Sequence, residues 1–297
     1  MMDPTEKEKW LEAGKIGKTI RDYAVSISKP GTLLLDLAKE IEKKTSELGA
    51  KPAFPPNLSI NQIAAHYTPK YNDKTLLQEG DVLKIDVGAS VDGFLSDTAA
   101  TVVIGGEEID LLKATREALE EAIKLARPGA KVDDISRAIE TKIKSYNLSP
   151  IVNLGGHGLN RYEVHEGEFI ANSVTNSSKT LRVEGAIAIE PFATTGGGYV
   201  IDSPEVQILM LERHKQTRSR LGRQILEFIE SEYKTMPFSK RWIVEKFGVI
   251  SEIELKNLVR EGALYEFNVL KEKDNGLVSQ FEHTLLFDNG EVIVTTL

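Results

Sequence analysis

The sequence predicts a mixed α/β protein made of two related halves. Long stretches carry apolar residues every three or four positions, which is typical of amphipathic helices, and short runs rich in Val and Ile lie between them. The same order of elements occurs twice along the chain, once after Lys29-Pro30-Gly31 and again after Arg127-Pro128-Gly129. Together these observations predict an α/β fold with an internal duplication.

The composition is that of a folded protein. The chain has 297 residues, of which 41% are hydrophobic and 28% are charged, so it can bury a sizeable core and is unlike disordered, collagenous or coiled-coil chains. The formal net charge of −8 argues against a general nucleic-acid binder. The absence of cysteine excludes disulfides, zinc ribbons, thiol nucleophiles and Fe–S clusters. Neither a signal peptide nor an apolar run of the roughly 18–20 residues of a membrane helix is visible, so we expect a cytoplasmic protein.

The first half begins with two predicted helices. Apolar side chains at helical spacing predict a helix from Thr5 to Ser28, which Lys29-Pro30-Gly31 ends. A second helix follows and ends near Gly49, a residue that readily adopts the left-handed conformation after a helix. The apolar face of this second helix contains Leu34, Leu37, Ala38, Ile41 and Leu48.

The second half repeats this order. A helix over 107–126 ends at Arg127-Pro128-Gly129, and another runs from about Asp133 to Tyr146. Each helix pair leads to a loop with a histidine, and then to a Glu-Gly pair that opens a β-rich run ending in a carboxylate. The two histidines are His66 and His157, and the two carboxylates are Asp86 and Glu190.

Two hairpins and a helical insertion complete the prediction. The runs VLKIDVG and TAATVVIG flank Asp92-Gly93, a typical turn pair, and predict a hairpin centred on Val91-Asp92. The runs on either side of Asp288-Asn289-Gly290 predict another hairpin. From Ser203 to about Gly262 the pattern is helical without β-content, so we expect a helical insertion subdomain at about 205–262 within a single domain spanning 1–297.

The first hairpin, with this centre, places Asp86 directly opposite Asp97. Carboxylates paired in this way lie about 4.5–5.5 Å apart at Cβ and repel each other, so the fold needs a compensating charge. A hard divalent cation would supply it, because such ions prefer carboxylate oxygen. The alternative is a register slip of one residue, which would turn one of the two Asp side chains to the solvent.

Three further residues could complete a metal site. His157 lies in the segment NLGGHG, which suits a displayed side chain but also a plain turn. Glu190 and Glu282 lie in apolar β-runs, where an unpaired carboxylate is costly unless strand alternation turns it outward. Five ligands, four of them anionic, exceed what one catalytic zinc takes and suit two divalent ions about 3.5–4 Å apart. His66 and His165 remain as polar groups for a substrate.

A set of short motifs occurs in a fixed order along the chain. The motifs are Ala64-Ala65-His66-Tyr67-Thr68-Pro69, Lys84-Ile85-Asp86-Val87-Gly88, Ser96-Asp97-Thr98, Gly156-His157-Gly158, Val164-His165-Glu166-Gly167, Ala188-Ile189-Glu190-Pro191-Phe192 and Gln280-Phe281-Glu282-His283-Thr284. In this order they resemble the methionine aminopeptidases, specifically type 2. The helical insertion resembles a type 2 hallmark, and the start of the chain resembles archaeal members. The resemblance implies the pita-bread fold, with two pseudo-symmetric halves around a dinuclear site and a winged-helix-like insertion.

The resemblance also implies a cofactor of two divalent metal ions. Their identity stays open, because Co, Mn, Fe and Zn all accept such ligands. Asp97 and Glu282 would bridge the two ions, and a bridging hydroxide would attack the carbonyl carbon of an N-terminal methionine. The implied metal ligands are Asp86, Asp97, His157, Glu190 and Glu282.

The remaining candidate residues would act on the substrate. Glu190 would be the general base, His66 would face the scissile nitrogen, and His165 would help to stabilise the oxyanion. The methionine pocket would include Phe54, Val164 and Tyr265.

The resemblance implies partners as well. The substrate would be the N-terminal methionine of nascent polypeptides with a small second residue. It would be processed by a monomer that contacts the ribosome transiently and binds neither membrane nor specific nucleic acid. One alternative is a non-catalytic adaptor of the same fold that binds RNA or the ribosome, although such adaptors are expected to lack metal ligands. Its contact would involve a basic cluster, otherwise read as a solvated helix face, of Arg213, Lys215, Arg218, Arg220 and Arg223. A prolidase-like peptidase is disfavoured because it carries an extra N-terminal domain, for which there is no room before Pro30.

Overall fold

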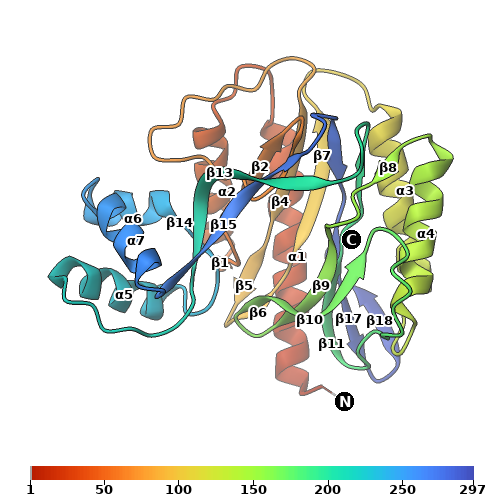
Figure 1. Ribbon diagram of the computed structural model, residues 1–297. Helices are drawn as coiled ribbons and strands as arrows, with labels where there is room; N and C mark the ends of the chain where they lie inside the picture. The colour runs from red at the N-terminus through yellow and green to blue at the C-terminus, as the bar shows by residue number, and fades with distance from the viewer. Residues whose placement is uncertain (1) are drawn as a thin grey trace.

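A computed structural model describes residues 2–297 (Figure 1). The helices in this range are α1 (Pro4–Ile27), α2 (Leu34–Glu47), α3 (Asp110–Leu125), α4 (Val132–Ser145), α5 (Arg220–Glu232), α6 (Lys240–Phe247) and α7 (Ser251–Arg260). The strands up to Val103 are β1 (Lys51–Pro52), β2 (Asn57–Ile60), β3 (Ile63–Ala65), β4 (Val82–Val87), β5 (Ala89–Val91), β6 (Phe94–Leu95) and β7 (Thr98–Val103). The later strands are β8 (Ser149–Pro150), β9 (Gly155–Asn160), β10 (Glu163–Ala171), β11 (Gly185–Ile189), β12 (Phe192–Thr194), β13 (Val200–Leu211), β14 (Phe238–Ser239), β15 (Leu264–Glu272), β16 (Val278–Gln280), β17 (His283–Asp288) and β18 (Glu291–Val294).

Each predicted half contains a helix pair packed on an antiparallel sheet. In the first half, α1 and α2 pack on the sheet β2-β4-β7 around one apolar core. In the second half, α3 and α4 pack on the sheet β10-β9-β11-β17-β18 around another core, on the right of Figure 1. The predicted α/β class is therefore confirmed, and the order of helices and strands agrees with the duplication read from the sequence.

Local capping explains where the helices begin and end. The Asp3 carboxylate accepts hydrogen bonds from the backbone N–H groups of Thr5, at 2.9 Å, and Glu6, at 3.3 Å, and so starts α1. After α2, Gly49 has a φ of +81°, as expected for a residue that follows a helix end. Helix α3 begins at Asp110, later than the predicted 107, because the backbone of the residue before it is still extended.

The first hairpin has a different register from the one predicted. Asp86 lies opposite Ala99, so the prediction that Asp86 faces Asp97 directly is wrong. The turn is at Asp92-Gly93, where both residues have positive φ values of 51° and 89°, one residue later than the assumed centre. This moves the pairing by two residues, and a shift of two keeps a side chain on the same face of the sheet. Asp97 therefore still lines the same cavity as Asp86.

The insertion contains strands that the sequence analysis missed. The prediction of no β-content after Ser203 is wrong, because β13 continues to Leu211 and pairs with β15, and β14 lies beside it. The extent of β13 depends on its pairing with β15, a non-local contact that the helical patterns of the following residues do not reveal. The three predicted helices are confirmed as α5, α6 and α7, on the left of Figure 1. They enclose a separate core that includes Leu209, Ile225, Ile229, Phe238, Ile243 and Leu258.

A buried ion pair attaches this insertion to the first half. The Arg241 guanidinium, on α6, is fully buried and donates to both carboxylate oxygens of Glu42, on α2, at 3.2 and 2.5 Å. Arg241 also donates to the carbonyl of Pro69 at 3.2 Å, and the indole N–H of Trp242 donates to Glu42 at 2.8 Å. Because charged groups in such a place need partners, this pair fixes how the insertion sits on α2. Within residues 2–297, no helix has the combination of length and apolar character needed to span a bilayer.

We predict that Arg241→Met destabilises the protein by about 3 kcal/mol, because it leaves the Glu42 carboxylate without its buried cation. Urea unfolding of the variant and the wild type measures the loss. The matched control is Arg116→Met, which removes an ion pair with Glu108 on the exposed surface of α3 and should cost less than about 1 kcal/mol. Equal losses in the two variants would contradict the anchoring role of Arg241.

Candidate metal centre and substrate cavity

One cavity of about 430 Å³ lies between the two halves and the base of the insertion. Its wall contains every candidate site residue predicted from the sequence. These are Phe54, His66, Asp86, Asp97, His157, Val164, His165, Glu190, Tyr265 and Glu282. Residues that are far apart in the chain therefore converge on one cavity.

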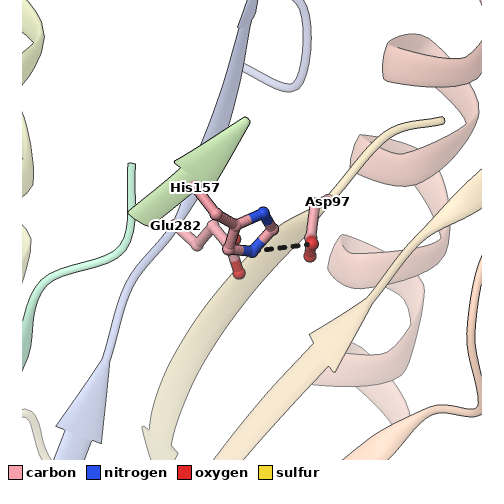
Figure 2. A group of neighbouring side chains, drawn as sticks. All are labelled: Asp97, His157 and Glu282. Atoms are coloured by element: carbon pink, nitrogen blue, oxygen red, sulfur yellow. Dashed lines mark ion pairs between the residues drawn. The ribbon is translucent and has the colours of Figure 1, made fainter. Parts of the chain in front are cut away.

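The five predicted ligands come from five strand segments. Asp86 lies in β4 and His157 in β9, whereas Asp97 precedes β7, Glu190 follows β11 and Glu282 precedes β17. Figure 2 shows Asp97, His157 and Glu282 pointing toward one another, and ligand atoms of these three lie within 4.8 Å of one another. The imidazole Nε2 of His157 lies 3.7 Å from Asp97 Oδ2 and 3.6 Å from Glu190 Oε1.

Hydrogen bonds from threonine hydroxyls and the backbone hold these segments in place. The Thr284 hydroxyl accepts a hydrogen bond from the backbone N–H of Asp97, at 2.8 Å, and donates one to the carbonyl of Asp97, at 2.7 Å. The Thr98 hydroxyl donates to the carbonyl of Glu282 at 2.8 Å, and Glu282 also exchanges backbone hydrogen bonds with Ala99. Strand β7 of the first half is thus joined directly to the segment that leads into β17.

The carboxyl groups are electrostatically strained. Loss of solvation, opposed by hydrogen bonds from neighbouring side chains, raises the pKa of Asp86 to about 7. Loss of solvation, followed by the negative charge of neighbouring carboxylates, raises the pKa of Asp97 and of Glu282 well above the usual value. Burial lowers the pKa of His157 well below its usual value, so its imidazole is neutral and has a lone pair to offer.

The donor set fits a divalent cation. Two carboxylate oxygens, Asp86 Oδ1 and Glu282 Oε1, are shielded from solvent and have no hydrogen-bond partner among the described residues. A buried polar atom without a partner is costly, and a cation would satisfy both of these oxygens while it offsets the crowded negative charge. Four carboxylates with one neutral imidazole match the ligand preferences of divalent metal ions.

His66 and His165 both line the cavity. His66 follows β3 and has a φ of +63°, a left-handed conformation that costs a residue with a side chain about 1–2 kcal/mol. Its Nδ1 lies 3.2 Å from the carbonyl of Asn268, and burial lowers its pKa to about 4. The ring of His165, on β10, lies 4.4 Å from that of His157 between ring centroids. The centroid of the Phe267 ring lies 5.5 Å from that of His66 and 6.1 Å from that of His165.

Sequence analysis missed two residues of the cavity region. The amide of Gln280 donates to Glu190 at 3.1 Å and to Glu282 at 3.3 Å. Phe267 lines the cavity between the two histidines. Both lie two positions from a predicted site residue, Glu282 or Tyr265, and the two-residue period of strands was the available signal.

Two related α/β halves around a cavity lined by four carboxylates and a neutral imidazole are suited to a metal-dependent hydrolase. Residues 8–233 match the family model of metallopeptidase family M24, and the chain belongs to this family. The resemblance stated from the motifs is confirmed at the level of the family.

Similar proteins support this assignment. A relative from Pyrococcus abyssi, called methionine aminopeptidase, is 50% identical over 97% of this chain and 99% of its own length. The crystal structure of methionine aminopeptidase from Thermotoga maritima has a TM-score of 0.71 at 24% identity and covers 99% of this chain and 98% of that one. A structure of a thermophilic Arx1 has a TM-score of 0.88 at 18% identity and covers 99% of this chain and 91% of that one. The two structures share the fold of this chain.

We predict that Asp97→Asn makes the metal-free protein more stable. Burial and the charges of neighbouring carboxylates raise the pKa of Asp97, so its charged form is unfavourable in the folded protein, and a neutral amide removes this cost. The same variant should respond less to Mn²⁺. A metal at 100 times its Kd stabilises a protein by about 2.7 kcal/mol, and the variant should gain clearly less than the wild type at equal Mn²⁺. Thermal unfolding with and without Mn²⁺ measures both effects. An equal gain in both proteins would show that Asp97 is not a ligand.

Proposed function

We propose that this chain is a methionine aminopeptidase that removes the N-terminal methionine of nascent proteins and peptides when the second residue is small. The observation that carries the proposal is that five metal-ligand side chains and two histidines line a single cavity. The choice of methionine comes from the relatives of that name, one of them 50% identical over 97% of this chain.

The proposed metal ligands are those expected from the sequence. They are Asp86, Asp97, His157, Glu190 and Glu282. When bound, two divalent ions would activate a water molecule as nucleophile near neutral pH and polarise the substrate carbonyl. Co, Mn, Fe and Zn all suit these ligands, and the number and identity of the ions are part of the proposal.

Protein groups would move the protons. Glu190 borders the cavity and is proposed as the general base that takes a proton from water and passes it to the leaving amine. The amide of Gln280 donates to Glu190 Oε2 at 3.1 Å, which orients the carboxylate so that Oε1 faces the proposed metal and its water. Loss of solvation raises the pKa of Glu190, which favours its action as a base that can also hold a proton.

The two histidines would bind opposite sides of the scissile amide. A carbonyl can only accept, so neutral His66 donates from Nδ1 to Asn268, and its Nε2 is left as an acceptor for the N–H of the scissile bond. His165 is an exposed side chain on the cavity wall and would donate to the carbonyl oxygen as negative charge develops there. One such contact is commonly worth about 3 kcal/mol in the transition state.

The cavity also suits the methionine side chain and a free amine. We propose that Phe54, Val164 and Tyr265 form the apolar wall for the thioether. The carboxylate cluster favours a positively charged α-amine, which an acetylated or internal residue lacks. The contact between Phe267 and both histidine rings narrows this part of the cavity, which favours a small second residue.

The adaptor alternative is not favoured. An adaptor is expected to have lost metal ligands, whereas all five are present in this cavity. Two members of the basic cluster are also engaged locally, because Arg213 donates to the carbonyl of Gly262 and Arg223 to that of Thr217. Transient ribosome contact, a monomeric state and a cytoplasmic location remain proposals.

The decisive test is release of free methionine from Met-Ala-Ser by the purified protein with Mn²⁺. We expect release from Met-Ala-Ser, and none from its N-acetylated copy or after treatment with a chelator. Met-Trp-Ser should be cleaved far more slowly, because its second residue is large. Equal release from the acetylated peptide would contradict an aminopeptidase, and undiminished release with chelator would contradict a metal-dependent enzyme.

We predict that His66→Ala and His66→Gly both lower kcat by about 10²-fold or more, because both lose the acceptor for the scissile N–H. Their stabilities should differ. The Gly variant should be more stable than the Ala variant by about 1 kcal/mol in urea unfolding, since only Gly adopts the φ of +63° without strain. The control pair is Glu12→Ala and Glu12→Gly on the exposed face of α1, where Ala should be the more stable by about 1 kcal/mol. A change confined to KM would indicate that His66 only binds substrate.

A further inference from the structure

Arg182, between β10 and β11 in the chain, reaches over the β9–β10 hairpin. Its Nη2 donates to Glu166 Oε2 and to Glu168 Oε2, each at 2.7 Å, and its Nε donates to Glu168 Oε2 at 2.9 Å. Nη1 donates to the carbonyl of Leu159 at 3.0 Å, and Nη2 lies 3.3 Å from the carbonyl of Glu166. One guanidinium, largely shielded from solvent, thus ties β9 and β10 together by charge-assisted hydrogen bonds.

Glycines make room for this guanidinium. A Cβ on Gly158 would lie 2.0 Å from Arg182 Nη2 and equally close to the carbonyl oxygen of Glu166, and one on Gly167 would lie 2.7 Å from Arg182 Nη2. Gly167 also has a φ of +75°, which residues with a side chain rarely adopt. The hairpin is therefore shaped to receive Arg182 on the strand that carries His165.

The strand next to this contact is irregular. The pairing of β10 with β9 shifts between Glu163 and Glu166, and again between Glu166 and Phe169. His165 lies within the first shift, where extra residues interrupt the regular ladder. Its side chain is exposed toward the cavity, with ring contacts to His157 and Phe267. The position of the His165 ring therefore depends on how firmly the backbone around it is held.

We propose that Arg182 is a positioning residue for His165, an inference that rests on the proposed function. The guanidinium binds the carboxylates on both sides of Gly167 and so fixes the backbone directly after His165. Arg182 is absent from the cavity wall, so it acts through His165 rather than on the substrate. Loss of the Arg182 hydrogen bonds allows the irregular part of β10 to shift, which moves the His165 imidazole away from the substrate carbonyl that it would contact.

The test is a double-mutant cycle on the release of methionine from Met-Ala-Ser with Mn²⁺. Arg182→Met alone should lower kcat by about 10- to 100-fold with little change in KM, because misplacing a catalytic group by about 1 Å can cost that much. In a His165→Ala background the same substitution should cost less than about twofold, since the group that it positions is already gone. If Arg182→Met lowers kcat just as much in the His165→Ala background, the inference is overturned, because Arg182 would then act independently of His165. The surface control Arg116→Met should leave kcat unchanged.

Three further experiments keep the result interpretable. Arg182→Lys should restore part of kcat, because a lysine makes fewer of these hydrogen bonds. If Arg182→Met does not fold, Glu168→Gln replaces it, and its loss of kcat should likewise vanish in the His165→Ala background. The carbon-bound ring protons of His165 in the metal-free protein should shift and broaden in NMR spectra of Arg182→Met, with smaller changes for His66. An unchanged His165 signal would overturn the inference, and this readout does not depend on activity. A wild-type protein that releases no methionine would instead contradict the proposed function.

Discussion

The crowding of four carboxyl groups in one cavity is the constraint on which the rest of the structure depends. Asp97 and Glu282 are buried, and loss of solvation, followed by the charges of neighbouring carboxylates, raises the pKa of each. His157 is kept neutral by burial, so it adds a lone pair to the cluster rather than a compensating charge. A chain selected only for stability would place apolar side chains here. We infer that the cost is tolerated because the cluster gains a cation.

The cost also explains why the ligand-bearing backbone is held so firmly. Thr284 binds both the N–H and the carbonyl of Asp97, and Thr98 binds the carbonyl of Glu282. Arg21, on α1, donates to the Thr98 hydroxyl at 2.8 Å, so the first helix also supports the hydrogen bond between Thr98 and Glu282. Repulsion between carboxylates would otherwise be relieved by moving the strands apart. Hydrogen bonds across the two halves prevent this and keep the carboxylate side chains close together.

The sequence predicted which residues line the cavity better than it predicted the strands. Carboxylates inside apolar β-runs, such as Glu190 and Glu282, are rare enough to indicate chemistry, and both line the cavity. The register of Asp86 was not predictable from the turn residues alone, because moving the turn by one residue changes the pairing by two. Strand β13 was missed because its length is fixed by pairing with β15, a non-local contact. The role inferred for Arg182 depends on three segments that meet only in the folded chain.

The two histidines illustrate how such a site obtains its geometry. His66 is directed by a left-handed backbone, and His165 by an irregular strand, so neither follows the preference of its own segment. Departures of this kind persist only where the surrounding structure over-determines them. The carbonyl of Asn268 supplies that support for His66, and we infer that Arg182 does so for His165. The apolar cores can then tolerate many substitutions of similar volume, whereas each histidine depends on one or two specific polar partners. Function in this fold should therefore be more sensitive to these supporting contacts than stability is.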